Sequence, residues 1–368
     1  MVDLHVHYPM HLLGGVEDPR DVPRGMFKVL GREDGKLRAA VLNLAARALN
    51  FRHWDGGWRA TLPLLEAGGV DVACSVLYRP FSELDLEEPY AAPPESAYFG
   101  KLIELLEATE RDVQAAGHTI VREQADLDAE GIKFVHCVEG GFHLGATPQE
   151  VDANVRELAR RGVLYITLAH LFWRQVATNA PALPFLPDQV YNALFPQTGG
   201  LSELGVAAVK ACNDTGVIVD VSHMRQAAIA QTLALLDADT PVIASHSAYR
   251  FGAQTYNLAD ATIAQITARG GIVGLIFAQH QLNDGLRRRD TRTLDESLAV
   301  LDRHIDAIGA EHVAIGSDLD GFIKPTMGGV ETAADLAPFA AALRARHPAA
   351  ADGVLRENAL RVIRRRFP

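Results

Sequence analysis

Five histidines and two carboxylates lie at the ends of apolar segments along this sequence. They are His5, His7, His170, His223 and His246, together with Glu139 and Asp318. Imidazole and carboxylate groups, with no cysteine among them, are ligands that suit Zn²⁺, with Mn²⁺, Fe²⁺ and Co²⁺ as the alternatives. The residue types therefore predict a metal site.

Each of these residues also has an ordinary structural interpretation when it is taken alone. A single histidine in an apolar strand is more often a satisfied core residue, and an aspartate such as Asp318 before a glycine-containing turn is often a turn former. The pair His5-Val6-His7 is a weak motif by itself. The metal site is favoured because five of the 14 histidines fall at corresponding ends of different segments.

The chemistry open to such a set is hydrolysis. A bridging carboxylate lets two metal ions lie roughly 3.5–4 Å apart and share a water molecule, which lowers the pKa of that water toward neutrality. The resulting hydroxide attacks a polarised carbonyl, a second carboxylate carries its proton to the leaving amine, and a histidine stabilises the oxyanion. A small amide is the substrate that this chemistry suits.

The elements that must position these side chains are short apolar segments alternating with helical patterns. Gly, Pro or polar turns bound most of these segments, as expected for buried parallel strands. They cover Val2–Tyr8, Val70–Leu77, Ile132–Gly140, Val163–Leu171, Val217–Met224, Pro241–Ser247, Gly271–Ala278 and His312–Asp320. Eight such strands predict an α/β fold, a (β/α)8 TIM barrel of the metal-dependent hydrolase type, rather than an open sheet.

Helices are predicted between the later strands, at Ser202–Asp214, Ala259–Arg269 and Asp295–Ile308, each followed by glycine. Two early connections, at 10–69 and 79–131, are long and must carry insertions. No internal repeat or linker divides the chain, so residues 1–368 are predicted to form one domain. Barrel enzymes bind substrate at the carboxyl ends of their strands, where the histidines and carboxylates fall.

Composition limits the partners. The chain of 368 residues is 48% hydrophobic and carries a net charge of −11, which argues against a nucleic-acid partner. No apolar stretch is long enough to cross a bilayer, and no leader pattern follows Met1. Cys74, Cys137 and Cys212 are widely spaced, so we expect free thiols in a reducing compartment. We therefore expect a cytoplasmic protein that acts on a small-molecule substrate, away from membranes.

Taken in order, these motifs resemble the membrane (renal) dipeptidase family, peptidase family M19 of the amidohydrolase superfamily. The resemblance covers nearly the whole chain. Each motif is short, but the ordered set is specific. The motifs are Val138-Glu139-Gly140-Gly141, Thr167–His170, Gly200–Gly205, Asp220-Val221-Ser222-His223, Ser245-His246-Ser247, Arg269–Gly274, Ile315–Gly321 and Glu357–Val362.

The resemblance implies a binuclear zinc site in which Glu139 bridges the two ions. His5 and His7 would bind the first ion, and His223 and His246 the second. His170 would face the substrate carbonyl, and Asp318 would carry the proton. The family resemblance also makes a homodimer the expected assembly.

Three departures from the family pattern concern the site. His7 stands where the family usually has aspartate, which removes one negative charge. Phe142 separates Glu-Gly-Gly from His143. The family also carries an arginine just before the asparagine that corresponds to Asn257, and this chain has Tyr256 there. Because a carboxylate needs a cation, Arg250 is the candidate replacement. Tyr256 and Asn257 are the other candidate substrate contacts.

The function predicted from the sequence is hydrolysis of a dipeptide or a similar small amide. Fold alone does not fix the substrate. A non-peptide amide, a lactone or a phosphoester on the same barrel is the alternative, and a barrel that only binds a ligand is a further one. The phosphoester alternative predicts Arg or Lys at the strand ends, where the sequence has no clear candidate.

Overall fold

The parallel strands of the chain follow one another around a ring. The computed structural model describes residues 1–13, 57–83, 91–183, 186–286, 291–321 and 326–367. All eight predicted strands are present there, with a short additional one. The strands are β1 (Val2–Val6), β2 (Val72–Leu77), β3 (Thr119–Ile120), β4 (Lys133–Glu139), β5 (Tyr165–Thr167), β6 (Ile218–Asp220), β7 (Val242–Ser247), β8 (Val273–Leu275) and β9 (Val313–Ile315).

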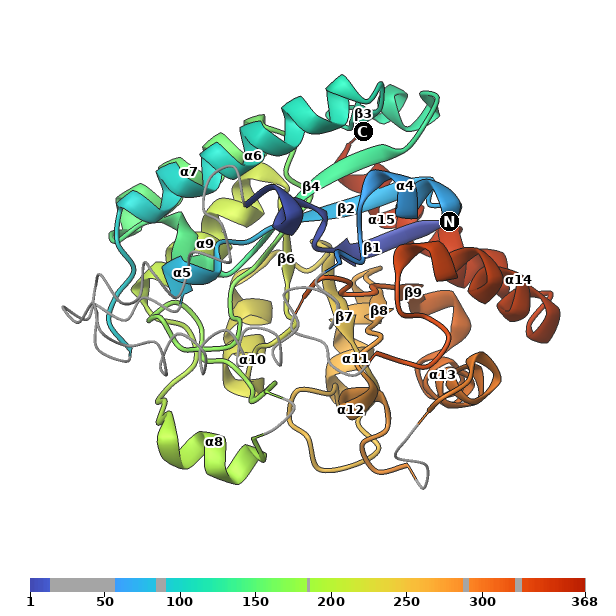
Figure 1. Cartoon of the computed structure of the whole chain (residues 1–368). Coiled ribbons are helices and arrows are strands. Elements are labelled where there is room, and N and C mark those ends of the chain that lie inside the picture. The colour runs from blue at the N-terminus through green and yellow to red at the C-terminus, as the bar shows by residue number, and fades with distance from the viewer. Residues whose placement is uncertain (14–56, 84–90, 184–185, 287–290, 322–325, 368) are drawn as a thin grey trace, which may run out of the picture.

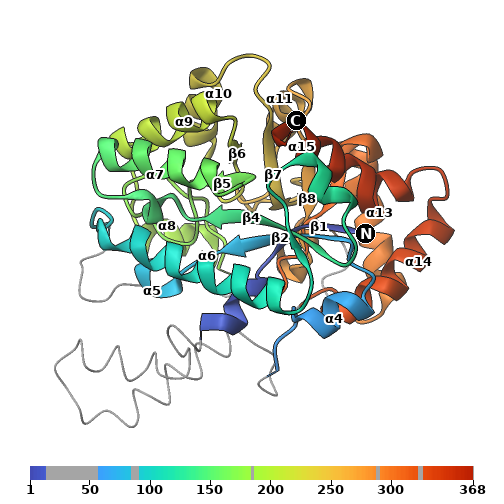
Figure 2. The same cartoon turned by 90° about the horizontal axis from the view of Figure 1, so that it is seen from above.

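Hydrogen-bonded neighbours run in the order β1-β2-β4-β5-β6-β7-β8-β9, and every pair is parallel. The ends of this order meet, because the Asp318 N–H donates to the His5 carbonyl and the His7 N–H to the Leu319 carbonyl. Figures 1 and 2 show the strands at the centre with helices outside them. The predicted (β/α)8 TIM barrel is confirmed.

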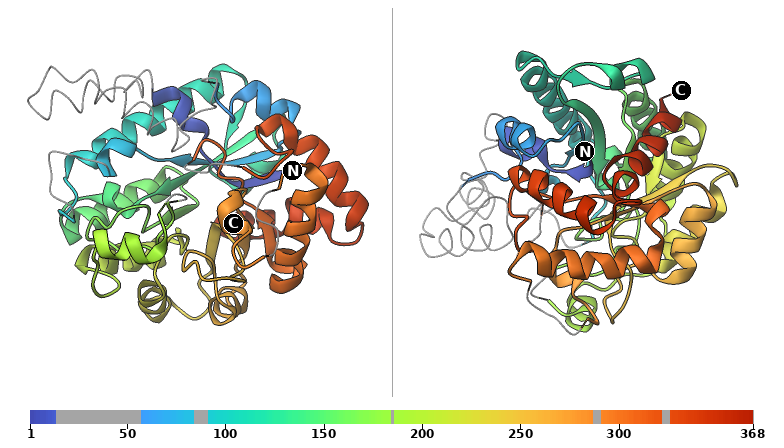
Figure 3. Two further views of the ribbon diagram at one scale, coloured as in Figure 1. Left: turned by 60° about the horizontal axis from the view of Figure 1, so that its bottom comes forward. Right: turned by 90° about the vertical axis from the view of Figure 1, so that its right-hand side faces the viewer.

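The helices cover the outside of the barrel, and the last of them lie beside the N-terminus (Figure 3). The longer ones are α6 (Ala97–Ala115), α7 (Pro148–Arg160), α9 (Glu203–Thr215), α10 (Gln226–Leu235), α11 (Asp260–Ala268), α13 (Leu294–Ile308), α14 (Leu336–Arg346) and α15 (Asn358–Arg366). The shorter ones are η1 (Tyr8–Leu12), α4 (Leu62–Ala67), α5 (Pro80–Glu83), η2 (Gln124–Asp128), η3 (Gly141–Leu144), α8 (Asp188–Leu194), α12 (Gln279–Leu282), η4 (Ala310–His312), η5 (Ala333–Asp335) and η6 (Gly353–Glu357).

The predicted helix boundaries agree with the local capping chemistry. The Ser202 hydroxyl accepts hydrogen bonds from the first N–H groups of α9, and Gly216 ends this helix with φ at +72°. Helices α11 and α13 also lie where they were predicted, and Gly309 follows the second of them. Capping residues thus fixed both ends of α9 from local sequence alone.

The two long early connections differ in how much of them the structure describes. Residues 14–56 of the predicted insertion 10–69 lie outside the described residues. Its last part is tied to the end of β9, since the Arg59 and Ala60 N–H groups donate to the Asp320 carboxylate. The insertion 79–131 holds α5, α6, the unpredicted β3 and η2. A single domain over the whole chain stays a prediction.

Neighbouring strands approach one another closely in the barrel. A Cβ atom on Gly274 or Gly316 would lie 1.9 Å from the Ser245 carbonyl oxygen, so glycine is required at both positions.

Cys74, Cys137 and Cys212 are buried and form no disulfide. Over the described residues, the helices are all too short or too polar to span a bilayer.

Candidate metal centre

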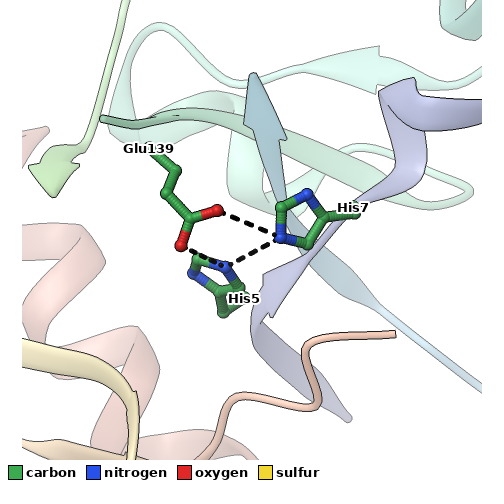
Figure 4. Close-up of side chains that lie close together, drawn as sticks. All are labelled: His5, His7 and Glu139. Carbon is green, nitrogen blue, oxygen red and sulfur yellow. Dashed lines mark hydrogen bonds and ion pairs between the residues drawn. The ribbon is translucent and has the colours of Figure 1, made fainter. Parts of the chain in front are cut away.

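Glu139, the last residue of β4, is the common neighbour of the predicted site histidines. Its carboxylate oxygens lie 3.3–3.7 Å from the Nε2 atoms of five imidazoles. These imidazoles belong to His5, His7, His170, His223 and His246. Figure 4 shows His5 and His7 of the β1 end turned toward Glu139. The carboxyl ends of β1, β4, β5, β6 and β7 therefore converge on one buried carboxylate.

Hydrogen bonds fix the tautomers of two of these imidazoles. The Tyr165 hydroxyl donates to the Leu4 carbonyl, so it accepts from His5 Nδ1–H, 2.8 Å away. The Ser245 hydroxyl donates to Asp220, so it accepts from His246 Nδ1–H, also at 2.8 Å. With the proton on Nδ1, each neutral ring presents a lone pair at Nε2.

Asp220, at the end of β6, supports this arrangement through hydrogen bonds. The side chain is fully buried and accepts five hydrogen bonds. The hydroxyl donors are Thr167, Ser222 and Ser245, which lie on three neighbouring strand ends. Groups that orient metal-binding histidines in this way typically contribute 10–100-fold to metal affinity, by a rough estimate. The sequence motif Asp-Val-Ser-His contained Asp220, but its role required the structure.

The donor set fits a divalent cation. The Nε2 lone pairs of His5 and His246 face the Glu139 Oε1 atom at 3.5 and 3.3 Å. An acceptor then faces an acceptor at Oε1, which is buried without a hydrogen-bond donor among the described residues. A cation among these atoms would satisfy all of them. Two of the groups with metal-ligand spacing are His5, His7 with Glu139, and Glu139 with His223, His246.

The protonation states of most of the cluster also suit metal binding. Burial, followed by the nearby His246, holds the pKa of His5 well below its usual range. Burial, followed by the nearby His170, does the same to the pKa of His223. Burial alone would raise the pKa of Glu139, but the imidazoles, His170 first, hold it well below its usual range. Neutral imidazoles and an ionised carboxylate are the forms that bind metal.

His7 behaves differently because it lies between two carboxylates. Its Nε2 atom is 3.0 Å from Asp318 Oδ1 and 3.3 Å from Glu139 Oε2. Burial lowers the pKa of His7, but hydrogen bonds to Asp318 and Glu139 outweigh it and raise the pKa to about 10. Without metal, His7 is therefore protonated at neutral pH and supplies the charge that balances these carboxylates.

Metal uptake at His7 is therefore expected to release a proton. His7 is charged below its pKa of about 10 and must be neutral to bind an ion, so loading near pH 7.5 should release about one proton from this position. Titration calorimetry with Zn²⁺ in two buffers of different ionisation enthalpy measures this release. The His7→Asp variant is the matched control and should release about one proton fewer. Equal release by both proteins would contradict the assignment.

Asp318 and His170 contact different members of the cluster. Asp318 follows β9 with a φ of +58°, and His223 has a φ of +64°. Left-handed backbone is uncommon outside glycine and costs energy, and it turns both side chains inward here. Asp318 contacts His7, while His170 Nε2 lies 3.3 Å from Glu139 Oε2.

Glu83 is a neighbour of the site that the sequence did not single out. This residue ends α5 and is buried, and its Oε2 atom lies 2.6 Å from His170 Nδ1. The Tyr78 hydroxyl donates to the same oxygen at 2.6 Å. No local signal marks Glu83, because it begins a stretch rich in acidic residues that reads as solvated surface.

The predicted substrate residues lie on the loop after β7. The Tyr256 hydroxyl donates to the His246 carbonyl, and its ring lies 4.9 Å from that of His223. The Asn257 amide donates to the Gln281 carbonyl. Arg250 donates to the carbonyl groups of Thr255 and Asn257, so it braces this loop. Contact of these three residues with substrate stays a prediction.

His143, which Phe142 separates from the Glu-Gly-Gly motif, lies in the turn after β4. His143 is buried, with Nδ1 against the Gly140 carbonyl at 2.9 Å and Nε2 accepting from the Arg79 N–H. Burial lowers the pKa of His143 to about 3, so the ring is neutral. His143 thus holds the turn after β4 in place.

A parallel eight-stranded barrel with imidazoles and carboxylates gathered at its strand ends defines the class of metal-dependent hydrolases. Within that class, the chain belongs to the membrane dipeptidase family (peptidase family M19), whose sequence profile matches residues 2–366. The resemblance seen in the sequence is thereby confirmed. Members of this family are metal-dependent hydrolases.

Two curated relatives carry the word dipeptidase in their names. Dipeptidase verJ of Clonostachys rogersoniana is 33% identical over 193 residues, which are 52% of this chain and 44% of that protein. An uncharacterized dipeptidase of Schizosaccharomyces pombe is 32% identical over 180 residues, 48% of this chain and 39% of that protein. The chain spans less than half the length of each of these relatives.

Solved structures share the fold. A metallo peptidase from Rhodobacter sphaeroides, bound to a phosphinate mimic of the dipeptide L-Ala-D-Ala, has a TM-score of 0.72 at 23% identity, over 100% of this chain and 99% of that one. The metallo peptidase dipeptidase AC has a TM-score of 0.67 at 24% identity, over 90% and 96%. At these identities the likeness establishes the shared fold.

Proposed function

We propose that this protein is a zinc-dependent dipeptidase with two ions. The observation that carries the proposal is the convergence of five imidazole Nε2 atoms on the buried Glu139 carboxylate. In this proposal Glu139 bridges the ions, and the remaining ligands are His5 and His7 on one side and His223 and His246 on the other. When bound, a pair of zinc ions would supply an acidified water and polarise a carbonyl group.

The residues that face the cluster from outside the ligand set have separate roles. Asp318 Oδ1 lies within hydrogen-bond reach of the cluster, so we assign it the transfer of the proton from water to the leaving amine. His170 turns Nε2 toward Glu139, so we assign it the hydrogen bond that Nε2–H of the doubly protonated ring donates to the carbonyl oxygen as negative charge develops there.

The substrate we assign by preference is a dipeptide. Family membership supports it, as does the dipeptide mimic bound by the Rhodobacter sphaeroides relative of the same fold. A cavity of about 570 Å³ lies between the loops after β5 and β7. Two of its lining residues are close in sequence to contacts of His223. Ala182 follows Ala180, whose N–H donates to the His223 carbonyl, and Thr255 precedes Tyr256, whose ring packs on His223.

The lining of this cavity favours a second candidate, a small amide without a free carboxylate. Among the described residues that line it, Asp188 is the one formally charged side chain, and it is negative. Burial lowers the pKa of the neighbouring His280 to about 4, so this ring is neutral. Arg250 is occupied with the loop backbone. An uncharged or cationic group would suit this lining better than a carboxylate.

Metal analysis and a matched substrate panel test the proposal. The purified protein, supplied with zinc or manganese, should bind about two equivalents of metal. Each L,L- or L,D-dipeptide is compared with its own C-terminal amide, and N-acyl amines, lactones and aryl phosphates complete the panel. Preference for the free acid supports the dipeptidase, and preference for the amide supports the second candidate. Less than about half an equivalent of metal would refute both. Homodimer formation and cytoplasmic location stay predictions.

A further inference from the structure

Glu83 binds three donors from two different loops. Its Oε1 atom accepts from the Phe172 N–H at 2.7 Å, and its Oε2 atom accepts from the Tyr78 hydroxyl at 2.6 Å. The third contact is His170 Nδ1, 2.6 Å from Oε2. Glu83 is 3% exposed, so this carboxylate is removed from bulk water.

These contacts determine which nitrogen of His170 carries a proton. An ionised carboxylate accepts hydrogen bonds and cannot donate them. Both oxygens of Glu83 accept from N–H and O–H donors, so Glu83 acts as the acceptor here and His170 Nδ1 is the donor. His170 Nε2 is then the atom turned toward Glu139, 3.3 Å away.

The ring is also held in orientation. The Tyr78 ring lies edge-on to the His170 ring with centroids 4.6 Å apart, while its hydroxyl binds Glu83. Arg174 donates to the Glu83 carbonyl oxygen, which ties the end of α5 to the loop after β5. Rotation of His170 about its side-chain bonds would break the charge-assisted hydrogen bond to Glu83.

We propose that Glu83 is the positioning residue for His170. It binds the proton on Nδ1 and aims Nε2 into the metal cluster, so that the hydrogen bond to an oxyanion comes from Nε2–H of a doubly protonated ring, whose positive charge the buried carboxylate stabilises. The role of His170 rests on the proposed function. The position of the proton on its ring does not.

The decisive variant is Glu83→Gln, which keeps the shape and replaces one accepting oxygen with an NH₂ group. The new NH₂ group is itself a donor. It then faces either the Phe172 N–H or the two donors that bind Oε2, the Tyr78 hydroxyl and His170 Nδ1. In the zinc-loaded protein we expect kcat for the best substrate to fall by about 10²–10³-fold. KM should change less than about threefold, because the proposed contact forms in the transition state. Metal content should match the wild type.

A second measurement needs no substrate. In zinc-loaded protein labelled with ¹⁵N-histidine, long-range ¹H–¹⁵N correlation spectra report which ring nitrogen is protonated. The His170 signals are identified by their absence in His170→Asn. Wild type should show a protonated Nδ1, and Glu83→Gln should shift this signal toward a mixture of tautomers. An unchanged His170 ring spectrum in Glu83→Gln would overturn the proposal.

Two further variants separate positioning from bracing. Tyr78→Phe removes one donor but leaves the contact between Glu83 and His170, so kcat should fall less than about tenfold. Glu95→Gln replaces an exposed glutamate just before α6 and should match the wild type. If Tyr78→Phe lowered kcat as much as Glu83→Gln, Glu83 would only hold the two loops together and would not be a positioning residue for His170. If wild type cleaved nothing in the panel, the proposed function would fail, and the spectra alone would decide the role of Glu83.

Discussion

Glu139→Gln is expected to abolish metal binding and activity together. The variant removes the one carboxylate that all five imidazoles of the cluster share, so the proposed pair of ions would lose its common ligand. We expect less than about half an equivalent of zinc per chain and a loss in kcat/KM of at least about 10³-fold. Metal analysis after gel filtration and the dipeptide assay measure the two effects.

The size of this effect follows from burial. Glu139 is inaccessible to solvent, so no water replaces the lost carboxylate oxygen, and the amide N–H₂ would point at imidazole lone pairs rather than at a cation. Glu130→Gln, an exposed glutamate shortly before β4, is the matched control and should retain both metal and activity. Full zinc content in Glu139→Gln would refute the bridging role.

Asp318→Asn is expected to separate catalysis from metal binding. Asp318 lies next to His7 but outside the ligand groups that include Glu139. An amide cannot take up a proton near neutral pH, so kcat should fall by about 10²–10⁴-fold. Zinc content should stay at the wild-type level, and KM should change less than about threefold. Steady-state kinetics and metal analysis of the same preparation provide the test.

The control for this variant is Asp306→Asn, an exposed aspartate on α13 that should behave as wild type. Loss of zinc in Asp318→Asn would make Asp318 a metal ligand instead of the proton carrier. Full activity of the variant would assign proton transfer to another group. The two failures differ in metal content, so the same measurements distinguish them.

His7 links the charge of the cluster to pH. Glu139 and Asp318 are the anionic groups in contact with it. Without metal, the protonated ring balances this charge, which links metal loading to pH. Metal affinity on the His7 side should therefore rise as pH rises toward 10.

Strand positions could be read from the sequence because each strand is buried on both sides. The segments Val70–Leu77 and Ile132–Gly140 are mostly apolar with turn residues near their ends, and β2 and β4 lie inside them. β3 was missed, because Thr119–Ile120 is too short to produce a pattern and exists only through pairing with Lys133 and Phe134. Its two residues gain their extended conformation from a neighbour.

The metal-ligand candidates were predictable for a different reason. In a parallel barrel the carboxyl ends of all strands meet at one face, so a histidine at the end of one predicted strand must lie near those of the others. That rule predicts from the sequence that His5, His223 and His246 lie close together. Their spacing in the chain carries no such information without the fold.

Local sequence thus determined the strands, the capped helices and the candidate ligands of this protein, because burial and capping act over a few residues. The tertiary structure alone decided which groups hold those ligands in place. Glu83 lies 87 residues before His170, and Asp220 lies 25 residues before Ser245. Their hydrogen bonds depend on how separate loops pack together, which no pattern within one segment encodes.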